Sequence, residues 1–125
     1  MAVVWTLANA TMPAKVPPPA EGIHLKLQVT GEGWNLVYES NNTINNTAFT
    51  ILLEAARTLH FPVIWSNWTV PADSILVQSI GSDVNGDGGR WWQYWINGAY
   101  GTVGADHAAL KNGDEVEWRF VQFPP

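Results

Sequence analysis

Residues 23–30, with the sequence IHLKLQVT, alternate strictly between apolar and polar side chains. In an extended chain the apolar side chains therefore share one face, which is the pattern of a strand that is buried on one side only. The segment GEG follows and predicts a tight turn, after which residues 34–40 (WNLVYES) predict the second strand of a β-hairpin. A half-buried hairpin must cover its apolar face with another element, so a second layer is required.

A single segment has the periodicity of a helix. Residues 48–60 place their apolar side chains on one face at helical spacing. Thr47 suits the N-cap position, because its hydroxyl can accept a hydrogen bond from a free backbone N–H, and Pro62 ends the helix. Three further strands are expected after it, at 73–81, 90–98 and 115–123.

The order of these elements predicts a fold class. A hairpin, one helix and then more strands in one small domain is the order of a β-grasp fold, an α+β fold in which a mixed sheet of about five strands packs on one helix. We expect this domain at residues 23–125. Residues 63–70 are compatible with either a loop or a short strand.

Two segments precede the expected domain. Residues 1–11 form an extension whose apolar part, AVVWTL at 2–7, predicts a strand. Residues 12–22 contain four prolines and predict an extended spacer, because proline fixes φ and lacks an N–H donor. At ~3.1 Å per residue the spacer spans roughly 34 Å, similar to the width of a domain whose radius of gyration is ~13 Å.

The apolar strand at 2–7 needs partners for its backbone and for its large side chains, which are those of Val3, Val4, Trp5 and Leu7. The simplest expectation is that this strand adds to the sheet edge of a neighbouring copy. Such a contact is head-to-tail and need not close, so it makes fibres. The alternatives are a strand that folds back onto its own sheet and a residual tag.

The composition excludes several classes of partner and activity. With six Lys and Arg against eleven Asp and Glu, the chain lacks the basic surface that nucleic acids and anionic membranes require. No run of eighteen apolar residues predicts membrane insertion, and there are no cysteines for disulfides or thiolate metal sites. No nucleophile elbow or phosphate loop is present, so we expect a protein that is not an enzyme.

The segment GGRWWQYWINGAYGTVGADHAALKNGDEVEWRFV carries a family resemblance. Its features are an aromatic strand ending in Asn97-Gly98, then Gly104-Ala105-Asp106, and finally Asn112-Gly113-Asp114 before Val116-Glu117-Trp118. With the upstream hairpin and helix, it resembles the C-terminal domain of transcobalamin and the related β-grasp family of exported bacterial and archaeal proteins, over about residues 23–121. The resemblance implies the fold and an extracellular or cell-surface location. In transcobalamin this domain helps to close over a corrinoid, but no corrinoid-contacting residue can be matched to a position here.

Four aromatic residues, Trp91, Trp92, Tyr94 and Trp95, crowd one expected strand. Alternation sends Trp92 and Tyr94 to the face opposite Trp91 and Trp95. We expect at least one pair to lie in the core and the other to form an exposed aromatic surface. That surface would pack against another subunit, or it would stack a glycan or other small ligand, with ordinary core packing as the remaining alternative.

The loop DVNGDG at 83–88 has the oxygen spacing of a calcium loop, with Asp83, Asn85 and Asp87 as candidate ligands. It lacks the bidentate acid at the twelfth position, where Tyr94 stands. Because Asn, Asp and Gly also dominate turns, a plain strand-to-strand turn is the alternative. No other cofactor is expected.

Four N-x-S/T sequons occur, where chance composition gives about one. Their asparagines lie in expected loops or tails, where a glycosylation acceptor is accessible. We therefore expect N-glycosylation and export, with an Asn- and Thr-rich polar surface as the alternative explanation. The four acceptors are Asn9, Asn41, Asn45 and Asn67.

Together these features predict a non-enzymatic, exported structural subunit that assembles with copies of itself into an extracellular fibre or surface layer by donating its N-terminal strand. The alternative is a secreted module that binds a small ligand or a glycan at the strand containing Trp91 and Trp95.

Overall fold

The computed structural model describes residues 22–43, 46–68 and 73–125. The predicted extension 1–11 and all but the last residue of the predicted spacer 12–22 lie outside these ranges. No helix in the described ranges is long and apolar enough to cross a membrane.

The elements are, in order, β1 (Ile23–Gly31), β2 (Trp34–Thr43), α1 (Ala48–Leu59), β3 (Val63–Trp68), β4 (Ser74–Ile80), β5 (Asp83–Val84), the 3-10 helix η2 (Asp87–Gly89), β6 (Arg90–Ile96), β7 (Ala99–Tyr100), the 3-10 helix η3 (Ala105–His107) and β8 (Glu115–Gln122).

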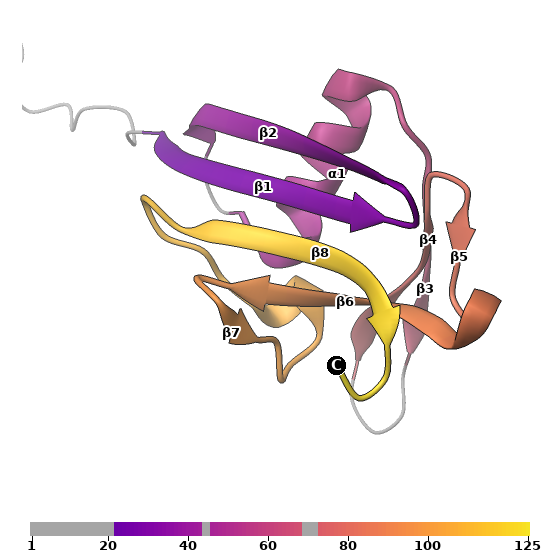
Figure 1. Ribbon diagram of the computed structural model, residues 1–125. Coiled ribbons are helices and arrows are strands. Elements are labelled where there is room, and N and C mark those ends of the chain that lie inside the picture. Colours follow the sequence, from indigo (N-terminus) through magenta and orange to yellow (C-terminus); the bar gives the residue numbers. More distant parts are fainter. Residues whose placement is uncertain (1–21, 44–45, 69–72) are drawn as a thin grey trace, which may run out of the picture.

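The expected mixed sheet has five strands in the order β2-β1-β8-β6-β7 (Figure 1). The first two strands form the predicted antiparallel hairpin, and β1 pairs with β8 in parallel. In the parallel register Leu27 lies opposite Val116, and Val29 lies opposite Trp118. All four side chains are buried, so the first and last strands of the described chain together supply the centre of the core.

The membership of the main sheet differs from the expectation at one strand. The segment expected at 73–81 does form a strand, β4, but it belongs to a second, three-stranded sheet in the order β3-β4-β5. The fifth strand of the main sheet is instead the two-residue β7. Local alternation could not reveal this difference, because it reports which face of a strand is buried and not which strand lies beside it.

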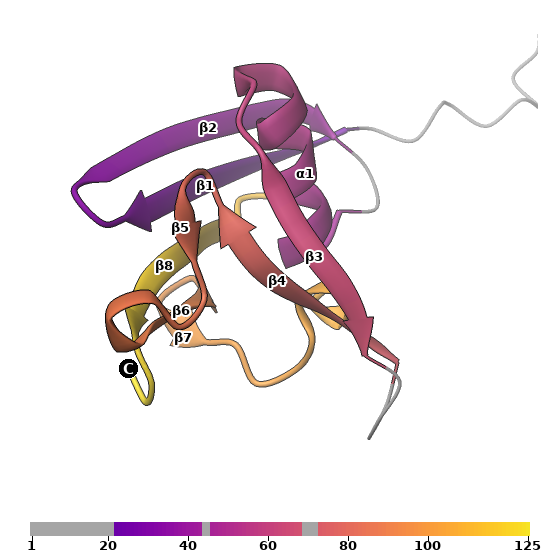
Figure 2. The same cartoon turned by 90° about the vertical axis from the view of Figure 1, so that its right-hand side faces the viewer.

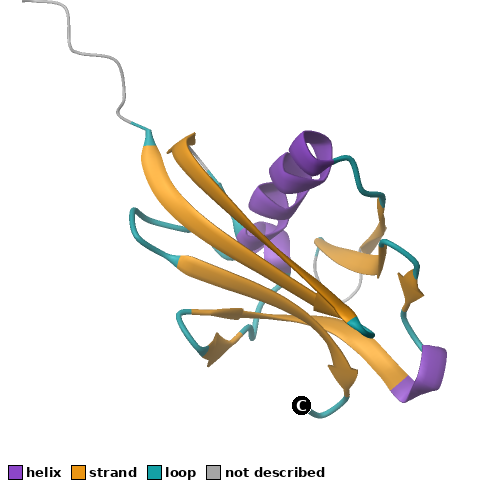
Figure 3. Cartoon of the chain, turned by 45° about the horizontal axis from the view of Figure 1, so that its top comes forward, coloured by secondary structure: helices purple, strands orange, loops and turns teal. Residues whose placement is uncertain are grey.

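The helix and the small sheet share the second layer of the fold. Figures 2 and 3 show α1 and the three-stranded sheet beside each other over the main sheet. Phe49 of α1 meets Trp65 of β3 edge-to-face, with ring centroids 5.3 Å apart. The chain is therefore an α+β structure of two layers, in which one helix alone does not cover the main sheet.

The predicted boundaries of the helix are confirmed. The Thr47 hydroxyl accepts a hydrogen bond from the Thr50 N–H at 3.1 Å, and the Thr50 hydroxyl accepts one from the Thr47 N–H at 2.7 Å. This reciprocal capping box satisfies two donors at the start of the helix. At the other end, His60 adopts the left-handed conformation with φ of 61°, and Pro62 follows.

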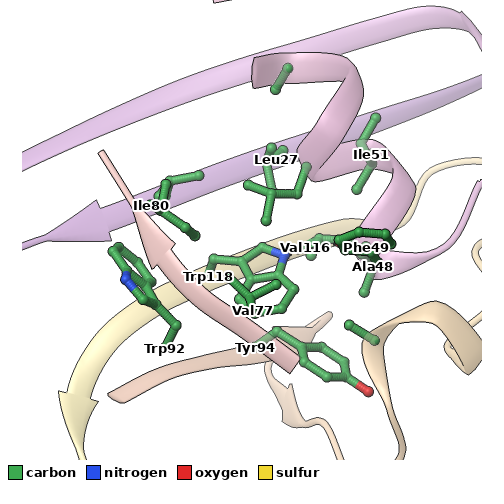
Figure 4. Close-up of a cluster of buried hydrophobic side chains, with 14 of the residues drawn as sticks. Leu27, Ala48, Phe49, Ile51, Val77, Ile80, Trp92, Tyr94, Val116 and Trp118 are labelled. Atoms are coloured by element: carbon green, nitrogen blue, oxygen red, sulfur yellow. Dashed lines mark hydrogen bonds between the residues drawn. The ribbon is translucent and has the colours of Figure 1, made fainter. Parts of the chain in front are cut away.

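The core lies between the two layers (Figure 4). The Trp118 indole nitrogen of β8 donates a hydrogen bond to the Ala48 carbonyl at 3.0 Å, which ties the main sheet to the first turn of α1. From the small sheet, Val77 and Ile80 of β4 enter the same cluster. One continuous core therefore joins both sheets and the helix.

Candidate functional site

Strand β3 forms an open edge with an apolar surface. It is the terminal strand of the small sheet, and no strand among the described residues pairs with its outer side. Three of its six side chains are large, apolar and exposed: Ile64 at 58%, Trp65 at 43% and Trp68 at 52%. We call this strand, Val63–Trp68, the β3 edge.

The β3 edge lacks the features that usually protect an edge strand. Its sequence, VIWSNW, contains neither a charged residue nor a proline, and both normally discourage pairing with another chain. β2, one of the two terminal strands of the main sheet, is different. It carries Glu39, whose carboxylate lies 3.7 Å from the His24 imidazole, and its one large exposed apolar side chain is Val37. Apolar exposure and absence of charge thus coincide at β3.

An apolar groove lies beside the small sheet and is centred on Trp91, whose side chain is 44% exposed. One part of the groove, of about 380 Å³, is lined mainly by Ile64, Leu76, Val84 and Trp91. A second part, of about 460 Å³, shares Leu76 and Trp91 and continues to Tyr100 and Phe123. We call the two parts together the Trp91 groove.

The alternation predicted for the aromatic strand is confirmed. Trp92 and Tyr94 point into the core, where Trp92 lies 6.1 Å from Trp34 and Tyr94 lies 5.3 Å from Trp118 between ring centroids. Burial raises the pKa of the Tyr94 hydroxyl, which donates to the Val103 carbonyl. The predicted aromatic surface therefore does not include Trp92 and Tyr94.

On the opposite face of β6, Trp95 is also covered and only 8% exposed. The Arg119 guanidinium lies over its ring at 4.2 Å from the centroid, and the Tyr100 ring packs against it at 5.4 Å. Glu117 holds Arg119 in place with a 2.6 Å ion pair. Of the four aromatic residues singled out from the sequence, Trp91 alone has a largely exposed ring.

The polar side chains of the groove are already engaged with the protein. The Tyr100 hydroxyl donates to the Gln93 side-chain oxygen at 2.8 Å, and the Gln93 amide nitrogen donates to the Val121 and Gln122 carbonyls. The Asn85 amide nitrogen donates to the Val77 carbonyl at 2.8 Å. The groove therefore offers chiefly apolar contacts to an incoming group.

The loop predicted to hold calcium makes hydrogen bonds to other elements of the fold. Asp83 accepts from the Glu32 N–H and from the Trp34 indole, each at 2.8 Å, through the same carboxylate oxygen. The side-chain oxygen of Asn85 accepts from the Trp92 N–H at 2.8 Å. Asp87 lies apart from both, at the start of η2.

These contacts fit the alternative of a structural turn better than they fit a cation site. Two of the three candidate ligands already use an oxygen to join the loop to other strands. The described part of the chain also contains no group of three His, Cys, Asp or Glu residues that could hold a metal ion.

Two of the four sequon asparagines lie in the described ranges, and both are exposed. They are in strands and not in loops as expected: Asn41 is in β2, because β2 continues to Thr43, and Asn67 is in β3. The side-chain oxygen of Asn41 lies 2.6 Å from the His24 ring nitrogen Nδ1. Asn9 and Asn45 lie outside the described residues, as does the predicted assembly strand with Val3, Val4, Trp5 and Leu7.

Comparison with known proteins finds a family model and a solved structure to which this chain is similar. Residues 64–122, from β3 to the end of β8, match a family described as a domain of unknown function, DUF4430. Among solved structures, the chain is similar to a candidate metal-binding protein from Ruminococcus gnavus ATCC 29149, with 15% sequence identity and a TM-score of 0.62. The similarity covers 80% of this chain and 97% of that one. No curated protein matches the sequence.

At this level of identity the structural similarity shows the fold alone. The DUF4430 match covers the segment on which the family resemblance was based, and the relationship to the transcobalamin domain stays a prediction.

Sequence reasoning did not find the β3 edge or the Trp91 groove. A usable signal was present, because the run VIWSNW is apolar, uncharged and free of breakers. What the run could not show is that only one side of this strand would be paired.

Proposed function

We propose that this chain is a non-enzymatic, exported structural subunit that assembles with copies of itself into an extracellular fibre or surface layer. Residues 2–7 of one copy add as a strand to a sheet edge of the next copy. The spacer at residues 12–22 determines how far that strand can extend from its own domain. The observation that carries the proposal is that the described fold has an open, uncharged edge with three large exposed apolar side chains. Such an edge in water is a template for another strand.

We further propose that the fold is a β-grasp and that the chain is related to the transcobalamin-like family. The central parallel pair β1 and β8, with α1 following the hairpin, supports this reading. N-glycosylation at the four sequons and an extracellular or cell-surface location belong to the same proposal. The exposure of Asn41 and Asn67 is consistent with it.

Assembly is tested by light scattering on the full chain and on Trp5→Asp, which places a charge in the donated strand. The full chain should scatter as a polymer, and Trp5→Asp should remain a monomer, because an aspartate cannot be buried against an apolar edge without a partner. Ala14→Asp in the spacer is the matched control and should still assemble. If the full chain is itself a monomer, the proposal fails.

The Trp91 groove supports a second candidate function, a secreted module that binds a small ligand or a glycan. Its aromatic lining suits stacking of an apolar or sugar ring, and the volume of its larger part is within the range of ligand sites. Titrating a panel of sugars while recording tryptophan fluorescence tests this function. A saturable change that Trp91→Ala abolishes would favour it, and unchanged emission across the panel would count against it.

The metal binding attributed to the Ruminococcus gnavus protein is not part of the proposal for this chain. The candidate oxygen atoms of Asp83 and Asn85 are used in hydrogen bonds between elements. These bonds support the alternative of a structural turn for this loop.

A further inference from the structure

We infer that the acceptor of the donated strand is the β3 edge of a second copy, so that the copies join head to tail. This inference rests on the proposed function and adds the identity of the acceptor. The occupant is the segment AVVWTL at residues 2–7, which has the same length as the six-residue strand β3.

The lengths of the four terminal strands exclude two of them as acceptors. β5 and β7 contain two residues each, so neither can form a ladder with a six-residue strand. β2 and β3 are long enough. The choice between them depends on the surface that the donated strand would cover.

The side chains favour β3 over β2. Pairing on β3 would remove Ile64, Trp65 and Trp68 from water, whereas β2 offers Val37 as its one large exposed apolar side chain. Burial of apolar surface is the main driving force for adding an apolar strand. β2 also places the charged Glu39 beside the incoming chain, and β3 has no charged residue.

The place where the described chain begins favours a second copy over the same copy as the acceptor. The described chain begins at the start of β1, on the side of the molecule opposite the small sheet (Figure 1). The bonds from Glu32 and Trp34 to Asp83 hold β5 at the turn end of the hairpin, one strand length from that start. A strand of nine residues such as β1 is roughly 30 Å long.

The direction in which the chain enters β1 favours donation to a second copy. The spacer reaches roughly 34 Å when extended. This length is sufficient to reach its own β3, but the proline-rich segment would have to reverse direction at the start of β1 to do so. A copy placed in line with the first receives the strand without any reversal, and repetition of that contact gives an open, polar fibre.

Cysteine cross-linking tests the acceptor directly, because the natural chain contains no cysteine. Full-length Thr6→Cys is mixed with full-length Ile64→Cys and treated with a short bis-maleimide, and the linked peptides are identified by mass spectrometry. Val37→Cys replaces Ile64→Cys in the matched control, because both positions are exposed aliphatic residues on terminal strands. The expected result is a link between residues 6 and 64 of different copies and none between residues 6 and 37.

The other outcomes separate this inference from the proposed function. A 6–37 link, or fibres that give neither link, would overturn the β3 acceptor while leaving self-assembly intact. A 6–64 link that forms only within single chains of a Thr6→Cys/Ile64→Cys double variant would overturn donation between copies. The proposed self-assembly itself is tested separately by light scattering, and it fails if the unsubstituted chain is a monomer.

Discussion

At the scale of single residues, Asn85 connects the two sheets where no strand pairing does. Its side-chain nitrogen donates to the Val77 carbonyl of β4, and its side-chain oxygen accepts from the Trp92 N–H of β6, each at 2.8 Å. Its own N–H donates to the Gln78 carbonyl at 2.9 Å. The side chain thus satisfies backbone groups on two strands that belong to different sheets.

Replacing this side chain should therefore destabilise the fold. Asn85→Ala leaves the Val77 carbonyl and the Trp92 N–H without their partner, so we expect a loss of about 2–4 kcal/mol in the free energy of unfolding. Urea denaturation followed by tryptophan fluorescence measures it. Asn35→Ala, at an exposed position of β2, should change the same quantity by no more than about 0.5 kcal/mol. Equal effects of the two substitutions would contradict the role given to Asn85.

Asp114 gives the stability of the fold a dependence on pH. Burial alone would raise its pKa, but hydrogen bonds from the Lys111 N–H and the Asn97 side chain, together with the charge of Lys111, hold that pKa below its ordinary value of 3.8. A carboxyl group whose pKa is lower in the folded state than in the unfolded state stabilises the fold at pH values above the unfolded-state pKa. That stabilisation is lost as the pH falls through the folded pKa.

We therefore expect Asp114→Asn to be less stable than the natural chain at pH 7, by about 1–3 kcal/mol. The difference should narrow as the pH is lowered below about 4, because the aspartate becomes protonated first in the unfolded chain and then, at lower pH, in the folded chain. Urea unfolding at a series of pH values measures both effects. Glu115→Gln, at an exposed neighbouring position, is the control. A difference between Asp114→Asn and the natural chain that does not vary with pH would contradict this account.

At the scale of elements, β3 combines two roles. Toward the core, Val63 packs against the main cluster, and Trp65 contacts Phe49 of α1. Toward solvent, the same strand presents the open edge with Ile64 and Trp68. Because β3 is held by β4 on one side and by the helix through Trp65, it is fixed in an extended shape before any partner arrives. Preorganisation of this kind lowers the entropic cost of pairing with another strand.

A charge on this strand should block assembly without unfolding the protein. Ile64→Lys removes an exposed apolar side chain and adds the residue type that natural edges use to prevent pairing. We expect Ile64→Lys to remain a monomer in light scattering, with a melting temperature close to that of the natural chain. Val37→Lys makes the same change on β2 and should still assemble. If Val37→Lys blocked assembly and Ile64→Lys did not, the acceptor edge would be β2.

At the scale of the whole molecule, the start of β1, from which the donor segment extends, and the acceptor strand β3 lie on opposite sides of the described domain (Figure 1). Each copy then has one contact to give and one to receive, and the two contacts use different surfaces. Such heterologous contacts grow without closing unless the rotation between copies completes a ring. Fibre growth should accordingly be polar.

Two defective variants should complement each other. Trp5→Asp can receive a strand but cannot donate one, and Ile64→Lys can donate but cannot receive. Each alone should be a monomer, and an equimolar mixture should form dimers that grow no further. Analytical ultracentrifugation distinguishes monomer, dimer and polymer. Long polymers in the mixture, or monomers only, would contradict a head-to-tail arrangement.

The features that the sequence predicted correctly depend on neighbours along the chain. The hairpin, the helix cap at Thr47 and the opposite orientation of Trp92 and Trp91 all follow from spacing within a few residues. The expectation that the ring of Trp95 would be exposed was wrong, and the reason is not local. Alternation placed Trp95 on the outer face correctly, but it could not show that Arg119, which comes from another strand, covers that ring.

The sequence by itself therefore determined the hairpin, the helix and the strands β4, β6 and β8, because side-chain periodicity is a local property of the backbone. It left residues 63–70 open between a loop and a strand, and it did not predict β5 or β7. Only the tertiary structure decided that β4 leaves the main sheet, that Asp83 accepts a hydrogen bond from Trp34, and that no described strand pairs with the outer side of β3. Backbone N–H and C=O groups are the same in every strand, so the choice of partner is made by packing between residues far apart in the sequence.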